Sequence, residues 1–117
     1  MNIIFGDAVD QVANSHTVLE LDTFRVTHSN KIIKTYCVID NVPLSEFSQL
    51  ENNKHIHQQL IEQYGLRNWQ FCLSAATSLM GKWNGELDSF YQIFQQRIEN
   101  YLIETPDENW TAIINRD

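Results

Sequence analysis

The sequence predicts an α+β fold, in which a small antiparallel β-sheet from residues 1–42 packs on a helical hairpin and a long helix from residues 43–117. Two observations predict this class. Strand-forming residues with apolar side chains on both faces fill the first half, and apolar residues recur every three or four positions in the second. The chain has the length of about one domain, so we expect residues 1–117 to form a single domain.

The first half predicts two long strands joined by a turn. Residues 17–27 and 32–39 are rich in Val, Ile, Thr and aromatic side chains. The polar tetrad 28–31 between them indicates a hairpin but does not fix its turn type. Ahead of the strands, the apolar run 2–5 is short, and Asp7 can cap a single helical turn.

The first long strand changes register within its own length. Leu19 and Leu21 point one way, whereas Phe24 and Val26 are out of step with them by one residue. A bulge or bend at residues 22–23 would restore one common apolar face, because it adds one residue to the strand.

After residue 40 the apolar spacing becomes helical. Asp40 or Asn41 can cap a short helix, Pro43 suits its first turn, and the polar stretch 51–54 should end it. A second helix follows, with Gly65 placed to stop it. The apolar stripe of this second helix consists of Ile56, Leu60, Ile61 and Tyr64.

Two further helices follow. The third begins at Trp69 and runs to Gly81, and the longest covers residues 86–104 with unbroken helical spacing. Residues 105–108 fit a capping box with proline at the first helical position. We expect a short terminal helix there; an added edge strand over residues 110–114 is the alternative.

Charge restricts the partners. Fifteen acids and eight bases give a net charge of −7. Direct nucleic-acid binding needs clustered bases, whereas here they stand singly: Arg25, Lys31, Lys34, Lys54, Arg67, Lys82, Arg97 and Arg116. We therefore expect no nucleic-acid binding. Residues 44–117 hold ten acids and five bases, so a charged partner of this half should be basic.

The chain has the sequence features of a cytoplasmic protein. Cys37 and Cys72 sit in apolar company without the spacing of a redox or zinc pair, which indicates buried free thiols. No basic-then-apolar leader opens the sequence, and its apolar runs fall far short of the roughly 18 residues that a membrane span needs. We expect no membrane association.

The turn at residues 65–68 is flanked by Tyr64 and Trp69. An aromatic that closes one helix and another that opens the next resembles a tetratricopeptide-type helix pair, in which repeats stack into a surface for partners. If the resemblance holds, the two rings pack together and fix the angle between the helices. Cys72 stands at the family's packing alanine.

Residues 55–112 also resemble the helical tail that follows the catalytic domain of many bacterial class III adenylate cyclases. The matching positions are Tyr64, Trp69, Arg97, Ile98, Tyr101, Pro106 and Trp110. The catalytic domain has no counterpart here, so the resemblance implies a helical tail for packing or partner contact and no cyclase activity. The whole chain, with its loop 81–85, also resembles small uncharacterised proteins of marine T4-like phages, a resemblance that implies no function.

Two features invite a binding site, and neither supports one. His55 and His57 lie two apart, so on a helix their side chains diverge; we expect both to face solvent and to hold no metal. The loop 81–85 has glycines but lacks the phosphate-loop spacing, and Asp88 already occupies the next helix start. An interhelical turn with a C-cap glycine and an Asn84 cap is favoured.

Three functions remain. The sequence offers no catalytic constellation or cofactor motif, so a non-catalytic protein-interaction or accessory module leads, marked by an exposed apolar patch near Trp83 or along the helical hairpin. A small-molecule-binding or enzymatic domain is the second possibility, and it would show an enclosed pocket with convergent polar groups. A structural oligomer subunit is the third, and it would show a large symmetric apolar interface. We expect Trp69 in the core, and Trp83, exposed in its loop, with Lys82 and Arg67 at the partner contact.

Overall fold

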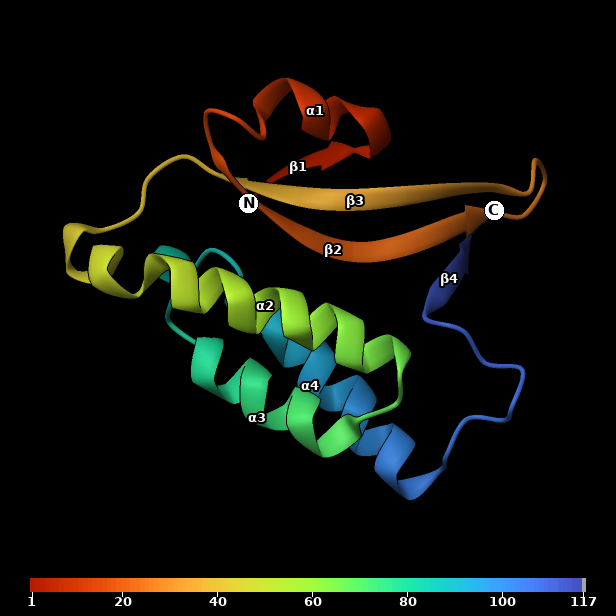
Figure 1. Ribbon diagram of the computed structural model, residues 1–117. Coiled ribbons are helices and arrows are strands. Elements are labelled where there is room, and N and C mark those ends of the chain that lie inside the picture. The colour runs from red at the N-terminus through yellow and green to blue at the C-terminus, as the bar shows by residue number, and fades with distance from the viewer. Residues whose placement is uncertain (117) are drawn as a thin grey trace. The chain divides into compact units, whose positions relative to one another are not determined.

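The computed structural model describes residues 1–116 and has an α+β fold, as predicted, with a four-stranded mixed sheet and four α-helices (Figure 1). The chain divides into two compact units. We call residues 1–40 with 112–117 the sheet unit and residues 41–111 the helical unit. No helix within residues 1–116 is long and apolar enough to cross a membrane.

The sheet unit has the strand order β1-β3-β2-β4. Its strands are β1 (Asn2–Phe5), β2 (Thr17–Val26), β3 (Lys31–Ile39) and β4 (Ile113–Arg116). β1 and β2 pair antiparallel with β3, but β4 pairs parallel with β2, so the sheet is mixed rather than antiparallel as expected. The predicted helical turn between β1 and β2 is present as the 3₁₀ turn η1 (Gly6–Ala8) and the short helix α1 (Val9–Val12).

The predicted bulge in the first long strand is confirmed. Pairing passes from Glu20 opposite Tyr36 to Thr23 opposite Lys34, so β2 carries one extra residue there. The hydroxyl of Thr35 donates a hydrogen bond to the carbonyl of Asp22 at 2.7 Å and satisfies the backbone at the bulge.

The expected terminal helix is wrong. After residue 104 the chain forms a turn in which the amide of Trp110 donates to the carbonyl of Asp107 at 3.1 Å, and residues 113–116 then form β4. A helix of so few residues is marginal by itself, whereas Ile113 and Ile114 gain a backbone partner in β2. The alternative prediction, an edge strand over residues 110–114, describes this segment better than the helix does, although the strand begins at residue 113.

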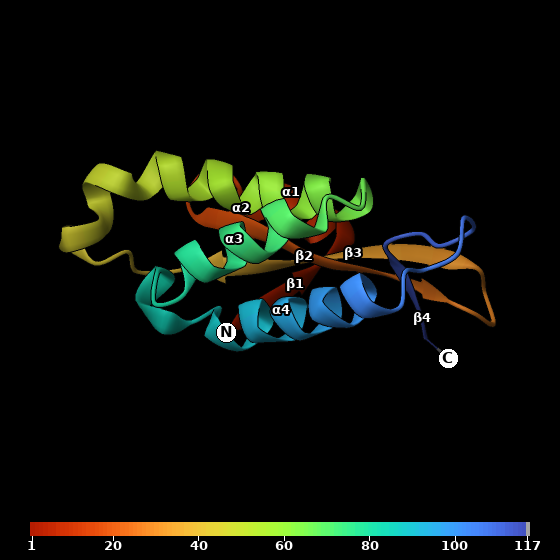
Figure 2. The same ribbon diagram turned by 90° about the horizontal axis from the view of Figure 1, so that it is seen from below.

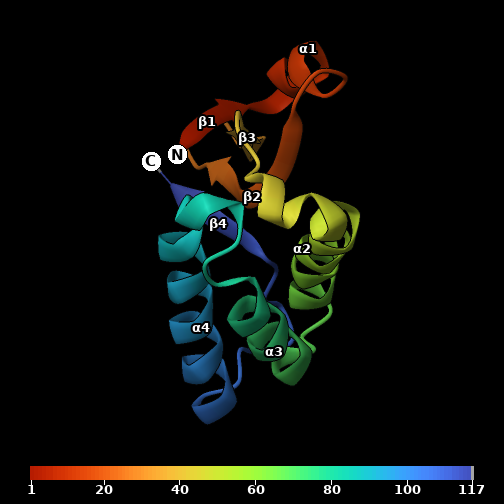
Figure 3. The same cartoon turned by 90° about the vertical axis from the view of Figure 1, so that its left-hand side faces the viewer.

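The helical unit contains the 3₁₀ turn η2 (Leu44–Gln49), α2 (Leu50–Gly65), α3 (Trp69–Leu79), the 3₁₀ turn η3 (Trp83–Gly85) and α4 (Asp88–Ile103). α3 packs against both α2 and α4, and the three helices run side by side (Figures 2 and 3). The polar stretch 51–54 does not end a helix; it forms the first turn of α2. Its residues are adequate helix formers, and Lys54 pairs with Glu51 at 3.6 Å.

The turn between α2 and α3 is closed by an arginine. Gly65 is the last residue of α2, and the left-handed residue is Arg67 at φ 66°. The amide of Asn68 donates to the carbonyl of Gln63 at 3.0 Å, as in a Schellman motif. The helix therefore ends at Gly65 as predicted, but the left-handed conformation that follows it belongs to Arg67 and not to a glycine.

The loop 81–85 is an interhelical turn, as favoured. Gly81 adopts φ 81°, and its amide donates to a carboxylate oxygen of Asp88 at 2.8 Å. The carboxylate of Asp88 thus accepts the hydrogen bond that the Gly81 amide would otherwise offer to a phosphate. The predicted side-chain cap at Asn84 is wrong, because Asn84 instead takes a left-handed backbone conformation with φ 57°.

A polar cluster lies in the core of the helical unit. The indole N–H of Trp83 donates to the hydroxyl of Tyr91 at 2.9 Å, and Nδ1 of His57 lies 2.9 Å from the same oxygen. The backbone amide of Trp83 donates to the carboxylate of Glu46 at 2.9 Å, which ties η3 to η2. Trp83 and His57 are each 1% exposed. The expected exposed indole and the expected solvent-facing His57 are therefore wrong.

His57 is buried because the inner face of α2 is not the purely apolar stripe that the sequence suggested. The buried residues of this helix are Asn53, His57, Leu60 and Tyr64, which recur at spacings of three and four. Two polar residues thus occupy core positions. His55, two residues from His57, is exposed as predicted.

Replacing Trp83 with alanine should lower the free energy of unfolding by about 3–5 kcal/mol, because it removes a large buried ring and the donor to Tyr91. Urea unfolding followed by circular dichroism measures this change. Phe47→Ala in η2 is the matched control, since Phe47 is exposed, and it should change stability by less than about 0.5 kcal/mol. A Trp83→Ala protein as stable as wild type would contradict the buried position.

Candidate functional site

An open apolar groove of about 470 Å³ lies in the helical unit, where α3 begins and α4 ends. Its lining residues are Arg67, Asn68, Trp69, Gln70, Phe71 and Leu102. Phe71 is 45% exposed and Leu102 is 42% exposed. Two large apolar side chains therefore face solvent in one concave surface, which is the usual character of a contact site.

Five aromatic rings pack together next to the groove, and one of them, Trp69, lines it. We call them the aromatic cluster: Tyr64, Trp69, Phe94, Tyr101 and Trp110. Tyr64 contacts Phe94, Trp110 and Trp69, with ring centroids 4.6, 5.4 and 5.9 Å apart. Trp69 in turn lies 5.0 Å from Tyr101 and 5.4 Å from Trp110. The cluster joins α2, α3, α4 and the segment that follows α4.

The predicted contact between Tyr64 and Trp69 is confirmed, and both residues are buried, as expected for Trp69. Burial raises the pKa of the Tyr64 hydroxyl well above its usual value, so the ring stays neutral in the cluster. Edge-to-face contacts of this kind add stability beyond the area that they bury.

Arg67 holds the segment after α4 against the start of α3. Its guanidinium donates to the carbonyl of Pro106 at 2.9 Å and to the carbonyl of Asp107, and it lies 5.3 Å from the ring centre of Trp110. Because two carbonyls and an aromatic face already engage the guanidinium, Arg67 acts as a clamp within the chain. It lines the groove, and its hydrogen-bond donors face carbonyls of its own chain, while its positive charge remains because these partners are neutral.

Four exposed acids lie outside the lining of the groove but on segments that adjoin it: Glu99, Glu104, Asp107 and Glu108. Glu99 precedes Leu102 by three residues on α4 and therefore shares its face. The other three belong to the segment that Arg67 clamps beside the groove. We call these four residues the acidic flank. Residues 97–108 hold these four acids and one base, Arg97, and the groove lining adds the base Arg67, so acids outnumber bases in this part of the helical unit.

Cys72 lies one residue after Phe71 and is turned into the core. Its thiol is 3.6 Å from the carbonyl of Leu60, and burial raises its pKa to about 11. The thiol therefore stays protonated at neutral pH and is a poor nucleophile there. Cys37, in the sheet unit, is likewise a buried thiol that is not part of a disulfide, which confirms the prediction for both residues.

The three predicted contact residues are not brought together. Arg67 lies at the start of α3 and lines the groove, whereas Lys82 and the buried Trp83 follow its end, about 16 Å away along the helix axis. Sequence reasoning missed Phe71 as a site residue. The available signal was its position off the buried stripe of α3, because a large aromatic on the outer face of a helix has no core to fill.

No group of three or more His, Cys, Asp or Glu within residues 1–116 is placed to hold a metal ion. The chain matches no family model, no curated protein and no solved structure. The resemblance to tetratricopeptide-like tails therefore stays a prediction, even though Tyr64, Trp69, Tyr101 and Trp110, four of the residues that carry it, meet in one cluster.

Replacing Arg67 with methionine should lower the free energy of unfolding by about 1 kcal/mol, because charge-assisted bonds to two partly exposed carbonyls are lost. Hydrogen exchange at the amide of Trp110 should become faster, since the clamp no longer orders its turn. Lys82→Met is the matched control at the other end of α3 and should alter neither quantity. Unchanged exchange at Trp110 in Arg67→Met would show that the clamp does not order this segment.

Proposed function

We propose that this protein is a non-catalytic interaction module of the cytoplasm that binds a segment of a protein partner in the groove. The observation that carries the proposal is the exposure of Phe71 and Leu102 in one concave surface beside the acidic flank. For an interaction module we expected an exposed apolar patch along the helical hairpin. The resemblance to partner-binding helical repeats supports the same reading.

The groove suits a protein segment better than a small molecule. It is open rather than enclosed, and of its polar lining residues Arg67 is already engaged by backbone carbonyls. Small-molecule sites bury most of their ligand among convergent polar groups. An open groove with two apolar anchors and a polar rim instead has the anatomy of a protein interface.

Charge defines the partner segment further. The acidic flank would attract lysine or arginine on either side of the residue that enters the groove, and it would repel an acidic segment. The partner should therefore present an apolar side chain flanked by bases. The rigid aromatic cluster reduces the conformational entropy lost on binding, because the groove wall is already ordered.

A phage-displayed library of random peptides, selected against the full chain, tests this function. Enriched peptides should carry an aliphatic or aromatic residue flanked by lysine or arginine. Synthetic copies should bind at least about tenfold more weakly to Phe71→Ala and to Leu102→Ala, because these variants remove the anchors of the groove. Isothermal titration calorimetry gives the dissociation constants.

Leu44→Ala is the control for this experiment, because Leu44 is a large exposed apolar residue of the helical unit outside the groove lining. It should leave peptide binding unchanged. Selection of no peptide whose binding depends on Phe71 or Leu102 would contradict the proposed function.

A further inference from the structure

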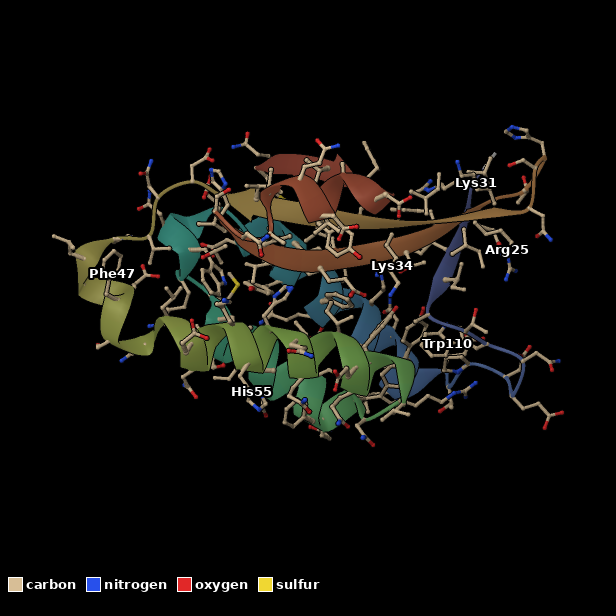
Figure 4. All side chains as sticks on the ribbon, turned by 45° about the horizontal axis from the view of Figure 1, so that its top comes forward. Arg25, Lys31, Lys34, Phe47, His55 and Trp110 are labelled. Atoms are coloured by element: carbon tan, nitrogen blue, oxygen red, sulfur yellow. The ribbon has the colours of Figure 1, made fainter. Side chains whose placement is uncertain are left out.

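The strand pairing of the sheet unit gathers bases that stand singly in the sequence. Three of the eight lie where the β2–β3 hairpin and β4 end together: Arg25 on β2, Lys31 on β3 and Arg116 on β4. A fourth, Lys34, lies further along β3, opposite Thr23. In the register, Val26 lies opposite both Lys31 and Arg116. Figure 4 shows Arg25 and Lys31 near the hairpin turn and Lys34 further along β3.

An exposed apolar side chain lies among these bases. Ile32 is 52% exposed, pairs with Arg25 across the hairpin, and follows Lys31 directly in the chain. We call Arg25, Lys31, Ile32, Lys34 and Arg116 the hairpin end. The described residues of segments 23–34 and 113–116 include no acid. Side chains alternate between the two faces of a sheet, so Ile32 shares its face with its partner Arg25 and with Lys34. Lys31 and Arg116 lie on the opposite face with Val26. The hairpin end thus presents an apolar residue with two bases on its own face.

The groove of the helical unit has the complementary chemistry. It offers Phe71 and Leu102 to an apolar side chain, and the acidic flank supplies four carboxylates for the bases around it. A partner segment for the groove needs an apolar anchor flanked by bases, and Ile32 with Arg25 and Lys34 on the same face meets that requirement.

We propose that the partner of the groove is a second copy of this chain, whose hairpin end enters it. The inference rests on the proposed function, because it names the occupant of the same groove. The contact joins two different surfaces, so each copy offers one groove and one hairpin end, and association runs head to tail. Pairing a basic surface with an acidic one also offsets the repulsion between two chains of charge −7.

A nucleic acid is the other class of partner that a basic surface can attract. The hairpin end fits it less well, because an isoleucine occupies its centre where nucleic-acid binders stack aromatic side chains on bases. The net negative charge of the chain also opposes the approach of a polyanion. The second copy is therefore the favoured occupant.

Two single substitutions and their mixture test the inference. Ile32→Asp destroys the hairpin end and keeps the groove, whereas Phe71→Asp destroys the groove and keeps the hairpin end. Both side chains are exposed, so the variants should fold, which circular dichroism checks. Sedimentation velocity at low salt should show association of the wild type that weakens as salt is added, and each variant alone should be a monomer.

An equimolar mixture of the two variants should form a one-to-one dimer, because it contains one intact groove and one intact hairpin end. The dimer cannot grow further, which distinguishes head-to-tail contact from any symmetric one. Leu44→Asp is the control and should associate like the wild type, since Leu44 belongs to neither surface.

A wild type that stays monomeric up to about 1 mM would overturn the inference, as would a mixture of variants that remains monomeric. If library peptides still bind the groove, only the identity of the partner is refuted and the proposed function stands. If no peptide binds through Phe71, the proposed function fails as well. Binding of a labelled single-stranded oligonucleotide that Lys31→Glu abolishes, with no self-association, would assign the hairpin end to nucleic acid and overturn the inference.

Discussion

The helical unit depends on the contacts that the Tyr64 ring makes at the end of α2. Its neighbours come from the start of α3, from α4 and from the segment beyond α4, with Phe94 and Trp110 among them. A short turn such as residues 66–68 does not by itself fix the angle between two helices. The rings supply that constraint, and Arg67 adds a polar clamp across the same junction. The groove exists because this junction is built from large side chains that leave Phe71 and Leu102 outside.

Charge is distributed unevenly over the fold. Strand pairing brings Arg25, Lys31 and Arg116 to one end of the sheet, and helix α4 with its following segment carries the acidic flank. The sequence does not show the basic cluster, because Arg116 is far from Arg25 along the chain, whereas three of the four acids lie together in residues 104–108. An acidic protein can thus present one basic surface and an apolar groove with acids beside it, which is the basis of the proposed self-recognition.

Local patterns in the sequence predicted most of the fold. Strands β2 and β3, the bulge near Asp22, α3, α4 and the Tyr64–Trp69 contact follow from periodicity and nearest-neighbour spacing. The errors concern residues whose environment is set by distant parts of the chain. Trp83 is buried because it reaches Tyr91, and the terminal segment is a strand because β2 offers it an edge. The groove could not be predicted, since exposure of Leu102 depends on where α4 ends relative to α3.

A double-mutant cycle between Tyr64 and Trp110 tests the central claim most directly, namely that the aromatic cluster joins the segment after α4 to the helical hairpin. Each residue is replaced by leucine, singly and together, and the free energy of unfolding is measured in urea. Direct ring contact predicts that the two substitutions couple by about 0.5–1.5 kcal/mol. Additive effects, within about 0.3 kcal/mol, would mean that the rings do not stabilise one another and would contradict this account of the groove.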